Sequence, residues 1–205
     1  MLIEQPPLLY RSLFPEAIWR IQKTGVKTAY LTFDDGPIPE VTPWILETLA
    51  KYNVKGTFFL VGDNVRKYPG LFAQIREQGH SYGNHTMHHI PGFRHSYRRF
   101  AEDIREAAEI IDSPLFRPPH GIMRWSQARK IKEKYNLVMY DVITRDYNYA
   151  LRPENILDNV KRYVRNGSII VFHDSLKSWF NLRNSLPEAI EWLRSEGYEL
   201  LPIPM

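Results

Sequence analysis

Two adjacent carboxylates, Asp34 and Asp35, end an apolar run in the stretch TFDDGP. A turn is one explanation, because Asp is common in turns and the Gly36–Pro37 pair that follows needs no function. Carboxylates are also the usual anionic ligands and proton acceptors of hydrolytic sites. The side chains that the fold brings beside these two acids therefore decide between a turn and a catalytic pair.

The stretch GNHTMHH contains two histidines, His85 and His89, that are four residues apart. On a helical turn this spacing places both imidazoles on one side, where they can bind one ion, as in other i, i+4 zinc motifs. His88 competes with His89 as the partner of His85, and a loop rich in histidine by chance is the alternative without function. A catalytic metal needs a hard anionic third ligand, which either Asp34 or Asp35 would supply.

The rest of the chain alternates between strand-like and helical patterns. Apolar, β-branched or aromatic runs predict strands at 28–34, 56–61, 80–84, 115–117, 137–143, 168–172 and 198–203. Between them, helices are expected at 42–52, 71–78, 98–111, 126–135, 153–165 and 187–195. This alternation indicates right-handed βα units and a parallel sheet, either open or closed into a barrel.

Polar residues at the ends of the predicted strands favour a barrel, because in a parallel barrel these ends converge on one face, where active sites form. The residues at or just beyond a strand end are Asp34, Asp35, His85, Arg117, Asp141 and His173. Six polar strand ends are far less easily explained by chance than one, so the opening carboxylate pair is interpreted as functional.

The composition is that of a soluble globular domain, with 205 residues of which 43% are apolar and 24% charged. The chain has no cysteine, so any metal must be bound by His, Asp or Glu. The net charge of +4 comes from scattered basic residues mixed with acidic ones. No basic stripe or RNA-binding signature accompanies it, and no nucleic-acid partner is expected.

The N-terminal residues 1–20 lack the positive charge and the unbroken apolar segment of a signal peptide. No run approaches the roughly 18 apolar residues of a membrane span. We therefore expect no transmembrane segment and a cytoplasmic protein, with peripheral attachment to the membrane or to the cell envelope as the alternative.

Five short motifs follow one another along the chain. They are TFDDGP at 32–37, HTMHH at 85–89, RPPHG at 117–121, ITRDY at 143–147 and IIVFHD at 169–174. In this order they resemble the motifs of the polysaccharide deacetylases, carbohydrate esterase family 4. The resemblance implies a distorted (β/α)7 barrel, TIM-like and single-domain, which agrees with the seven expected strands. It implies a catalytic domain at 28–205, with 1–27 as an N-terminal extension packed on the barrel.

The resemblance also implies roles for individual residues. Asp35, His85 and His89 would bind one divalent metal ion, with zinc expected and cobalt, nickel or manganese as alternatives. Asp34 would be the general base toward a metal-activated water, and His173 the general acid that protonates the departing sugar nitrogen.

Four further residues would support this chemistry. By the same resemblance, Arg117 would orient the base and Asp146 would orient the imidazole of the acid. The main-chain N–H of His120 would complete the oxyanion hole, beside Tyr147 in the substrate site.

Three residues depart from the family pattern. The position of His120 is commonly Tyr, and the fourth motif, usually two acids flanking a pair and then Trp, has Ile143, Asp146 and Tyr147. The orienting acid and the main-chain donor remain. These departures affect the wall of the sugar groove, and therefore which sugar binds.

We therefore expect a metal-dependent hydrolase that removes acetyl groups from N-acetylated sugars or polysaccharides, with O-acetylated carbohydrate as the alternative substrate. A rival enzyme is a deacetylase of a small non-polymeric amide or glycoconjugate. A rival of another class is a carbohydrate-binding protein with a weak or dead site. Loss of the base, the acid or a ligand would favour that last interpretation, and all are present.

Overall fold

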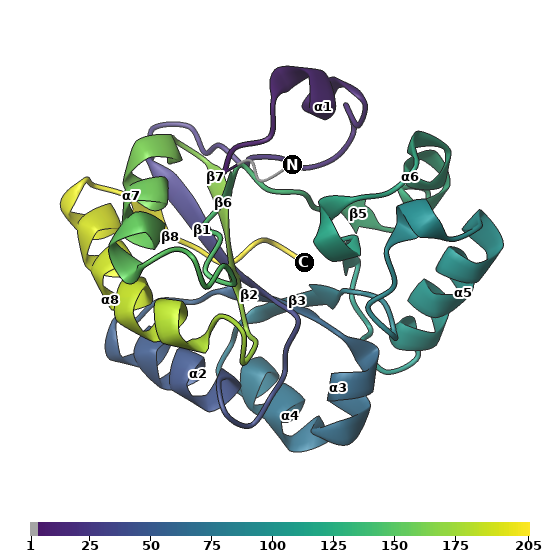
Figure 1. Ribbon diagram of the computed structural model, residues 1–205, viewed down its shortest axis with the longest axis horizontal. Coiled ribbons are helices and arrows are strands. Elements are labelled where there is room, and N and C mark those ends of the chain that lie inside the picture. Colours follow the sequence, from purple (N-terminus) through teal and green to yellow (C-terminus); the bar gives the residue numbers. More distant parts are fainter. Residues whose placement is uncertain (1–3) are drawn as a thin grey trace.

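A computed structural model gives the structure of residues 4–205, which fold into a curled parallel sheet surrounded by helices (Figure 1). Within these residues the strands follow the order β5-β4-β3-β2-β1-β7-β6, and β8 pairs with β1 off this path. The strands are β1 (Thr28–Asp34), β2 (Thr57–Leu60), β3 (Ser81–Asn84), β4 (Leu115–Phe116), β5 (Asn136–Leu137), β6 (Val142–Ile143), β7 (Ser168–His173) and β8 (Glu199–Leu200). The expected distorted (β/α)7 barrel is confirmed.

The central strand β1 carries the first predicted carboxylate. It pairs in parallel with β2 on one side and with β7 on the other, and all of its residues are buried. Phe33 of β1 stacks between Phe58 of β2 and Phe172 of β7, with ring centroids 5.1 and 6.2 Å apart. This packing explains an almost continuous apolar run, since a parallel strand is covered on both faces.

Helices cover the outside of the curled sheet, with α7 and α8 at one end of the view in Figure 1 and α5 and α6 at the other. They are α1 (Leu8–Ser12), α2 (Thr42–Lys51), α3 (Gly62–Lys67), α4 (Pro69–Glu77), α5 (Tyr97–Ala108), α6 (Trp125–Ile131), α7 (Pro153–Tyr163) and α8 (Trp179–Ser195), with 3-10 turns η1 (Gly92–Arg94) and η2 (Pro119–Gly121). No helix among residues 4–205 combines the length and the apolar character needed to cross a membrane.

The last helix starts earlier than expected. The sequence predicts a helix from residue 187, because proline is common in the first turn, but Pro187 lies inside α8, which begins at Trp179. Buried side chains on both sides of Pro187, such as Leu182 and Leu193, hold the longer helix against the sheet. The short α3, with few apolar residues, was not predicted.

The single strand predicted at 137–143 is wrong, because the chain changes partners within it. The N–H of Val138 donates to the carbonyl of Phe116 in β4, whereas Val142 and Ile143 pair with β7. Two short strands, β5 and β6, result. A run of apolar residues looks the same in either case, so periodicity did not reveal the change.

Asp141, between these two strands, lies at the opposite end of the barrel from the one predicted. Its carboxylate accepts hydrogen bonds from Arg11 (2.6 Å), Arg165 (2.7 Å) and Ser168 (2.6 Å), the first residue of β7. Burial alone would raise the pKa of Asp141, but these donors hold it below its ordinary value. Asp141 precedes β6 rather than ending a strand, which removes it from the set of convergent strand ends.

The N-terminal segment lies between the two ends of the sheet. Among residues 4–205, β5 and β6 do not pair with each other. Ile18 forms a parallel bridge with Val138, and Arg20 an antiparallel bridge with Ser168. Residues before β1 therefore contact both sides of the opening in the barrel.

Candidate active site

The carboxyl ends of the two central strands bring Asp34 and His173 beside each other. Asp34 is the last residue of β1 and His173 the last of β7, and the two are register partners in the parallel ladder. The N–H of Asp174 continues the ladder by donating to the carbonyl of Asp34 at 2.7 Å. Residues from distant parts of the chain therefore meet at one edge of the sheet.

The Asp34 carboxylate is held by Arg117. Nη1 of Arg117 donates to Oδ1 of Asp34 at 2.6 Å and to Oγ1 of Thr32 at 2.8 Å, and Nη2 donates to the carbonyl of Met139 at 3.0 Å. The guanidinium lies 4.0 Å from the centroid of the Phe59 ring, and Arg117 is only 1% exposed. These contacts fix the carboxylate through Oδ1 and leave Oδ2 for another partner.

Asp35, His85 and His89 form a cluster with the geometry of a metal site. One potential ligand atom from each lies within 4.8 Å of the others. Oδ1 of Asp35 is 3.7 Å from Nε2 of His85 and 3.1 Å from Nε2 of His89. Nδ1 of His85 lies 2.8 Å from the carbonyl of Arg117, which can only accept a hydrogen, so the proton is on Nδ1 and the lone pair on Nε2.

The charges of this cluster suit a cation. Burial lowers the pKa of His85 to about 4, so its imidazole is neutral at pH 7. Burial alone would raise the pKa of Asp35, but the hydrogen bond from His89 and the positive charge of His173 hold it well below its usual range. A carboxylate and a neutral imidazole are the forms in which these side chains bind divalent ions.

A loop holds the two histidines, and not the helical turn that the spacing predicted. β3 ends at Asn84, and the backbone then enters the left-handed region at Thr86 (φ 69°) and at His89 (φ 54°). The Asn84 side chain accepts from the N–H of Thr86 at 2.8 Å. The imidazoles still meet, with ring centroids 5.1 Å apart, because irregular backbone rather than helical periodicity turns them together.

The third histidine, His88, lies outside the cluster. Its Nδ1 is 2.7 Å from Oδ1 of Asp103 on α5. Oδ2 of Asp103 accepts from the N–H groups of Met87 and His88 at 2.9 and 3.0 Å. The fully buried Asp103 thus anchors the loop and binds the His88 ring outside the cluster of Asp35, His85 and His89.

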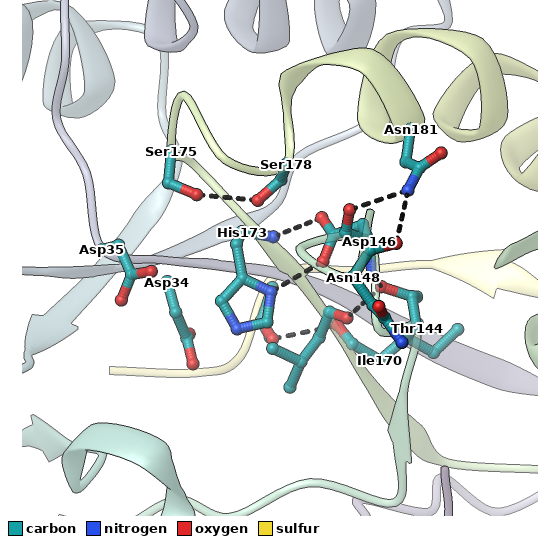
Figure 2. Close-up of polar contacts among 12 residues, drawn as sticks. Asp34, Asp35, Thr144, Asp146, Asn148, Ile170, His173, Ser175, Ser178 and Asn181 are labelled. Carbon is teal, nitrogen blue, oxygen red and sulfur yellow. Dashed lines mark hydrogen bonds and ion pairs between the residues drawn. The ribbon is translucent and has the colours of Figure 1, made fainter. Parts of the chain in front are cut away.

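His173 is held by Asp146 through both its backbone and its ring (Figure 2). Its N–H donates to Oδ2 of Asp146 at 2.8 Å, and its Nδ1 lies 2.7 Å from Oδ1. Burial alone would lower the pKa of His173, but the Asp146 carboxylate, with smaller contributions from Asp35 and Asp34, raises it to about 9. The imidazole is therefore protonated at neutral pH. Its other nitrogen faces away from Asp146, on the side of the ring where Asp34 and Asp35 lie.

A cavity of about 400 Å³ opens over these groups. His120, with φ 60°, borders the cavity beside the cluster of Asp35, His85 and His89. Its ring centroid is 4.8 Å from that of His89. Tyr147 borders it at the other end, edge-on to His173 with 4.8 Å between centroids. The cavity is also lined by Gly121, Tyr140, Ile143, Val171, Ser175 and Lys177.

All nine predicted site residues lie at this edge of the barrel. Seven of them line the cavity: Asp34, Asp35, His85, His89, His120, Tyr147 and His173. Arg117 and Asp146 are buried behind it, in contact with Asp34 and His173. The arrangement can hold a cation beside a carboxylate on one side and a protonated imidazole on the other.

Sequence reasoning missed three buried polar side chains near the site, namely Asp103, Asp174 and Asn181. Oδ2 of Asp174 accepts from Thr42 at 2.6 Å, and a Cβ at Gly36 would lie 2.0 Å from this oxygen, which explains the glycine after the carboxylate pair. Burial raises the pKa of Asp174 to about 8. Asp174 directly follows His173 in the motif IIVFHD, so the sequence offered a signal for its place near the site. No motif marks Asp103 and Asn181, which lie on helices.

Comparison with known proteins relates most of the chain to one family. A family model described as polysaccharide deacetylase matches residues 21–140. Over 206 residues the chain is 30% identical to a peptidoglycan-N-acetylglucosamine deacetylase of Bacillus cereus, and the alignment covers 96% of each protein.

Solved structures show the same fold. The crystal structure of a peptidoglycan N-acetylglucosamine deacetylase, in complex with 4-naphthalen-1-yl-N-oxidanyl-benzamide, is similar with a TM-score of 0.88 and 28% identity, covering 97% of this chain and 95% of that one. A pseudoenzyme of carbohydrate esterase family 4 from Bacillus anthracis is similar with a TM-score of 0.82 and 26% identity, covering 97% of this chain and 71% of that one. Chains of this fold thus include one described as a pseudoenzyme.

Proposed function

This chain belongs to the polysaccharide deacetylase family, and on that premise we propose that it is a metal-dependent hydrolase that removes acetyl groups from N-acetylated sugars or polysaccharides. The observation that carries the proposal is the convergence of Asp34, protonated His173 and the Asp35, His85 and His89 cluster on one cavity. Amide hydrolysis needs these functions together, because the carbonyl is a poor electrophile and the amine a poor leaving group.

The cluster fits a resident divalent ion. One carboxylate oxygen and two imidazole nitrogens match the donor set of catalytic zinc sites, in which a further position stays open. Asp35, His85 and His89 are the proposed ligands, for zinc first and for cobalt, nickel or manganese as alternatives. When bound, such an ion polarises the acetyl carbonyl and lowers the pKa of water. The carbonyl of Arg117 supports it by fixing the tautomer of His85.

Asp34 is the proposed general base. Because Oδ1 accepts from Arg117, Oδ2 is the oxygen that takes a proton from the attacking water. The strand places this carboxylate next to the cluster without making it a member. The buried Arg117 holds the carboxylate in one orientation during the proton transfer.

His173 is the proposed general acid. Its Nε2 proton passes to the sugar nitrogen as the C–N bond breaks, so that the amine leaves neutral rather than as an anion. Asp146 holds Nδ1–H and keeps the imidazole charged until this transfer. One water proton goes to Asp34 and the imidazole proton goes to the amine, so the acetyl group leaves as acetic acid, which ionises to acetate, and the other product is a free amino sugar. Asp34 then gives up its proton and His173 takes one up, which restores both groups for the next turnover.

The walls of the cavity supply the remaining contacts in this proposal. The main-chain N–H of His120 stabilises the oxyanion that forms from the acetyl carbonyl. Tyr147 offers an aromatic face and a hydroxyl to the sugar. Both residues border the cavity next to a catalytic group, so they affect which sugar fits.

Acetate release from a panel of substrates tests the proposal. The panel contains chitooligosaccharides, peptidoglycan fragments, acetylated xylan and small N-acetyl sugars, with metal-loaded wild type beside Asp34→Asn as the matched inactive control. We expect wild type to release acetate from an N-acetylated polymer and Asp34→Asn to release little or none. Activity on small amides alone would favour the non-polymeric rival. Sugar binding without acetate release from any substrate would indicate a binding protein.

A further inference from the structure

Asn181 lies behind His173, in the first turn of α8, and is only 4% exposed. Its Nδ2 donates to the main-chain carbonyls of Asp146 (3.0 Å), Asn148 (3.3 Å) and Leu151 (3.3 Å). Figure 2 shows the amide facing the backbone that carries Asp146. All three partners are acceptors, so they determine which amide atom is the nitrogen.

The backbone that receives these hydrogen bonds is irregular. It connects β6 to α7, and Arg145 within it has a left-handed φ of 65°. Asn159 of α7 anchors its beginning by donating to the carbonyl of Thr144 at 3.0 Å. From Asp146 onward the segment has short-range turn bonds, such as those from the N–H of Asn148 to the Arg145 carbonyl (2.9 Å) and from the N–H of Leu151 to the Asn148 carbonyl (3.0 Å). The hydrogen bonds from Asn181 connect this main chain to another element, α8.

The Asp146 carboxylate depends on this backbone for its position. Both of its oxygens contact His173, one through the main-chain N–H and the other through the ring. The main-chain contact ties one carboxylate oxygen to the end of β7, but neither contact holds the main chain of residues 146–151. The three bonds from Asn181 connect the segment to α8, which packs on the core through buried Leu182 and Leu186.

The amide of Asn181 also has a cost. Its Oδ1 is buried without a hydrogen-bond partner among residues 4–205. A buried unsatisfied acceptor destabilises a fold, and an apolar side chain of similar size would avoid the penalty. The two N–H groups of the amide offset this cost by donating to three carbonyls, with one hydrogen shared between two of them.

We propose that Asn181 is a positioning residue for the general acid, acting through the 146–151 backbone and Asp146 on the orientation of His173. The inference rests on the proposed function, in which His173 protonates the leaving nitrogen. Asn181 does not line the cavity, so it affects turnover without touching the substrate.

A double-mutant cycle tests this route. The proteins are wild type, Asn181→Leu, Asp146→Asn and the double variant. The matched control is Asn184→Leu on the same helix, because the exposed Asn184 donates to the Phe180 carbonyl of its own helix, at 2.7 Å, and not to the 146–151 backbone. Asn181→Leu should lower kcat about tenfold or more, part of the 10²- to 10⁴-fold that a general acid supplies, with KM nearly unchanged. In the Asp146→Asn background the same change should cost less than about threefold, because the residue it acts through is already altered.

An equal loss in both backgrounds, or a loss no larger than that of Asn184→Leu, would overturn the inference. Thermal melts check that each variant folds, and Asn181→Ala replaces the Leu variant if that one does not. A second readout needs no activity: the low-field proton NMR signal of Nδ1–H in the His173–Asp146 pair, identified by its absence in Asp146→Asn. It should be lost or broadened in Asn181→Leu and kept in Asn184→Leu, and an unchanged signal contradicts the inference. Wild type that releases no acetate, yet shows this pattern, would contradict the proposed function alone.

Discussion

Asp34 and Asp35 are neighbours in the chain, yet their carboxylates contact different partners. Asp34 pairs with Arg117 at 2.6 Å, whereas Asp35 lies 3.1 Å from His89. The backbone explains the divergence, because β1 ends at Asp34 and Asp35 has a left-handed φ of 82°. One acid is thereby directed to a buried guanidinium and the other to the imidazoles of the metal-like cluster.

Replacing Asp34 with Asn should abolish the base and spare the cluster. The amide keeps the size of the side chain but does not accept the proton of water, so kcat should fall by about 10²- to 10⁴-fold. Metal content, measured by elemental analysis, should stay at the wild-type level because Asp34 is not part of the cluster. A variant that loses its metal would show that Asp34 is a ligand.

Asp35→Asn should instead weaken metal binding, since a neutral amide replaces the anionic ligand. Competition with a chelator measures the affinity directly. Activity lost in this way should return in part with excess metal, which distinguishes the variant from Asp34→Asn. Wild-type affinity in Asp35→Asn would contradict the proposed ligand set.

The two neighbouring histidines should differ in their effect on metal binding. His89→Ala removes a potential ligand and should abolish tight binding of one divalent ion per chain. His88→Ala removes a contact to Asp103 and should leave the stoichiometry near that of wild type. Titration of metal-free protein with zinc compares the two, and loss of the ion in His88→Ala but not in His89→Ala would reverse the assignment.

The pH dependence of kcat/KM should have an alkaline limb set by His173. Burial lowers its pKa but Asp146 more than compensates, to about 9, so activity should fall as pH rises through that value and the proton is lost. In Asp146→Asn the carboxylate is gone and the effect of burial remains, so the limb should move to lower pH. The pH–rate profiles of wild type and Asp146→Asn make the comparison. An alkaline limb at the same pH in both proteins would show that Asp146 does not set the pKa of the general acid.

Asp174 should make the stability of the metal-free protein depend on pH. Its pKa is raised from 3.8 to about 8 by burial, so the folded chain keeps a proton that the unfolded chain releases. Between these values the contribution of Asp174 to the free energy of unfolding should fall as pH rises, by at most about 1.4 kcal/mol per pH unit. Asp174→Asn has no titrating group at this position, so it lacks this pH-dependent contribution to the free energy of unfolding. Denaturant unfolding of both proteins at several pH values measures the difference in the free energy of unfolding, which would stay constant if the pKa of Asp174 were the same in the folded and the unfolded chain.

The sequence by itself determined the central strand and the types of side chain that make up the candidate site. The run at 28–34 coincides with β1, because a strand covered on both faces needs a continuous apolar pattern that local composition records. The carboxylate pair and the histidines of GNHTMHH could be recognised as candidate catalytic and metal-binding residues from the sequence. Residue type and spacing are properties of a short segment, so they do not depend on the fold.

Only the tertiary structure decided which side chains face one another. Val138 and Val142 lie in one apolar run, yet the N–H of Val138 donates to β4 whereas Val142 pairs with β7. That change of partner carries Asp141 to Arg11 and Arg165, at the opposite end of the barrel. Likewise the contact of His88 with Asp103 and the reach of Asn181 to the Asp146 backbone depend on helices packed against distant loops. Periodicity describes one segment at a time, whereas these contacts are set by which segments the folded core brings together.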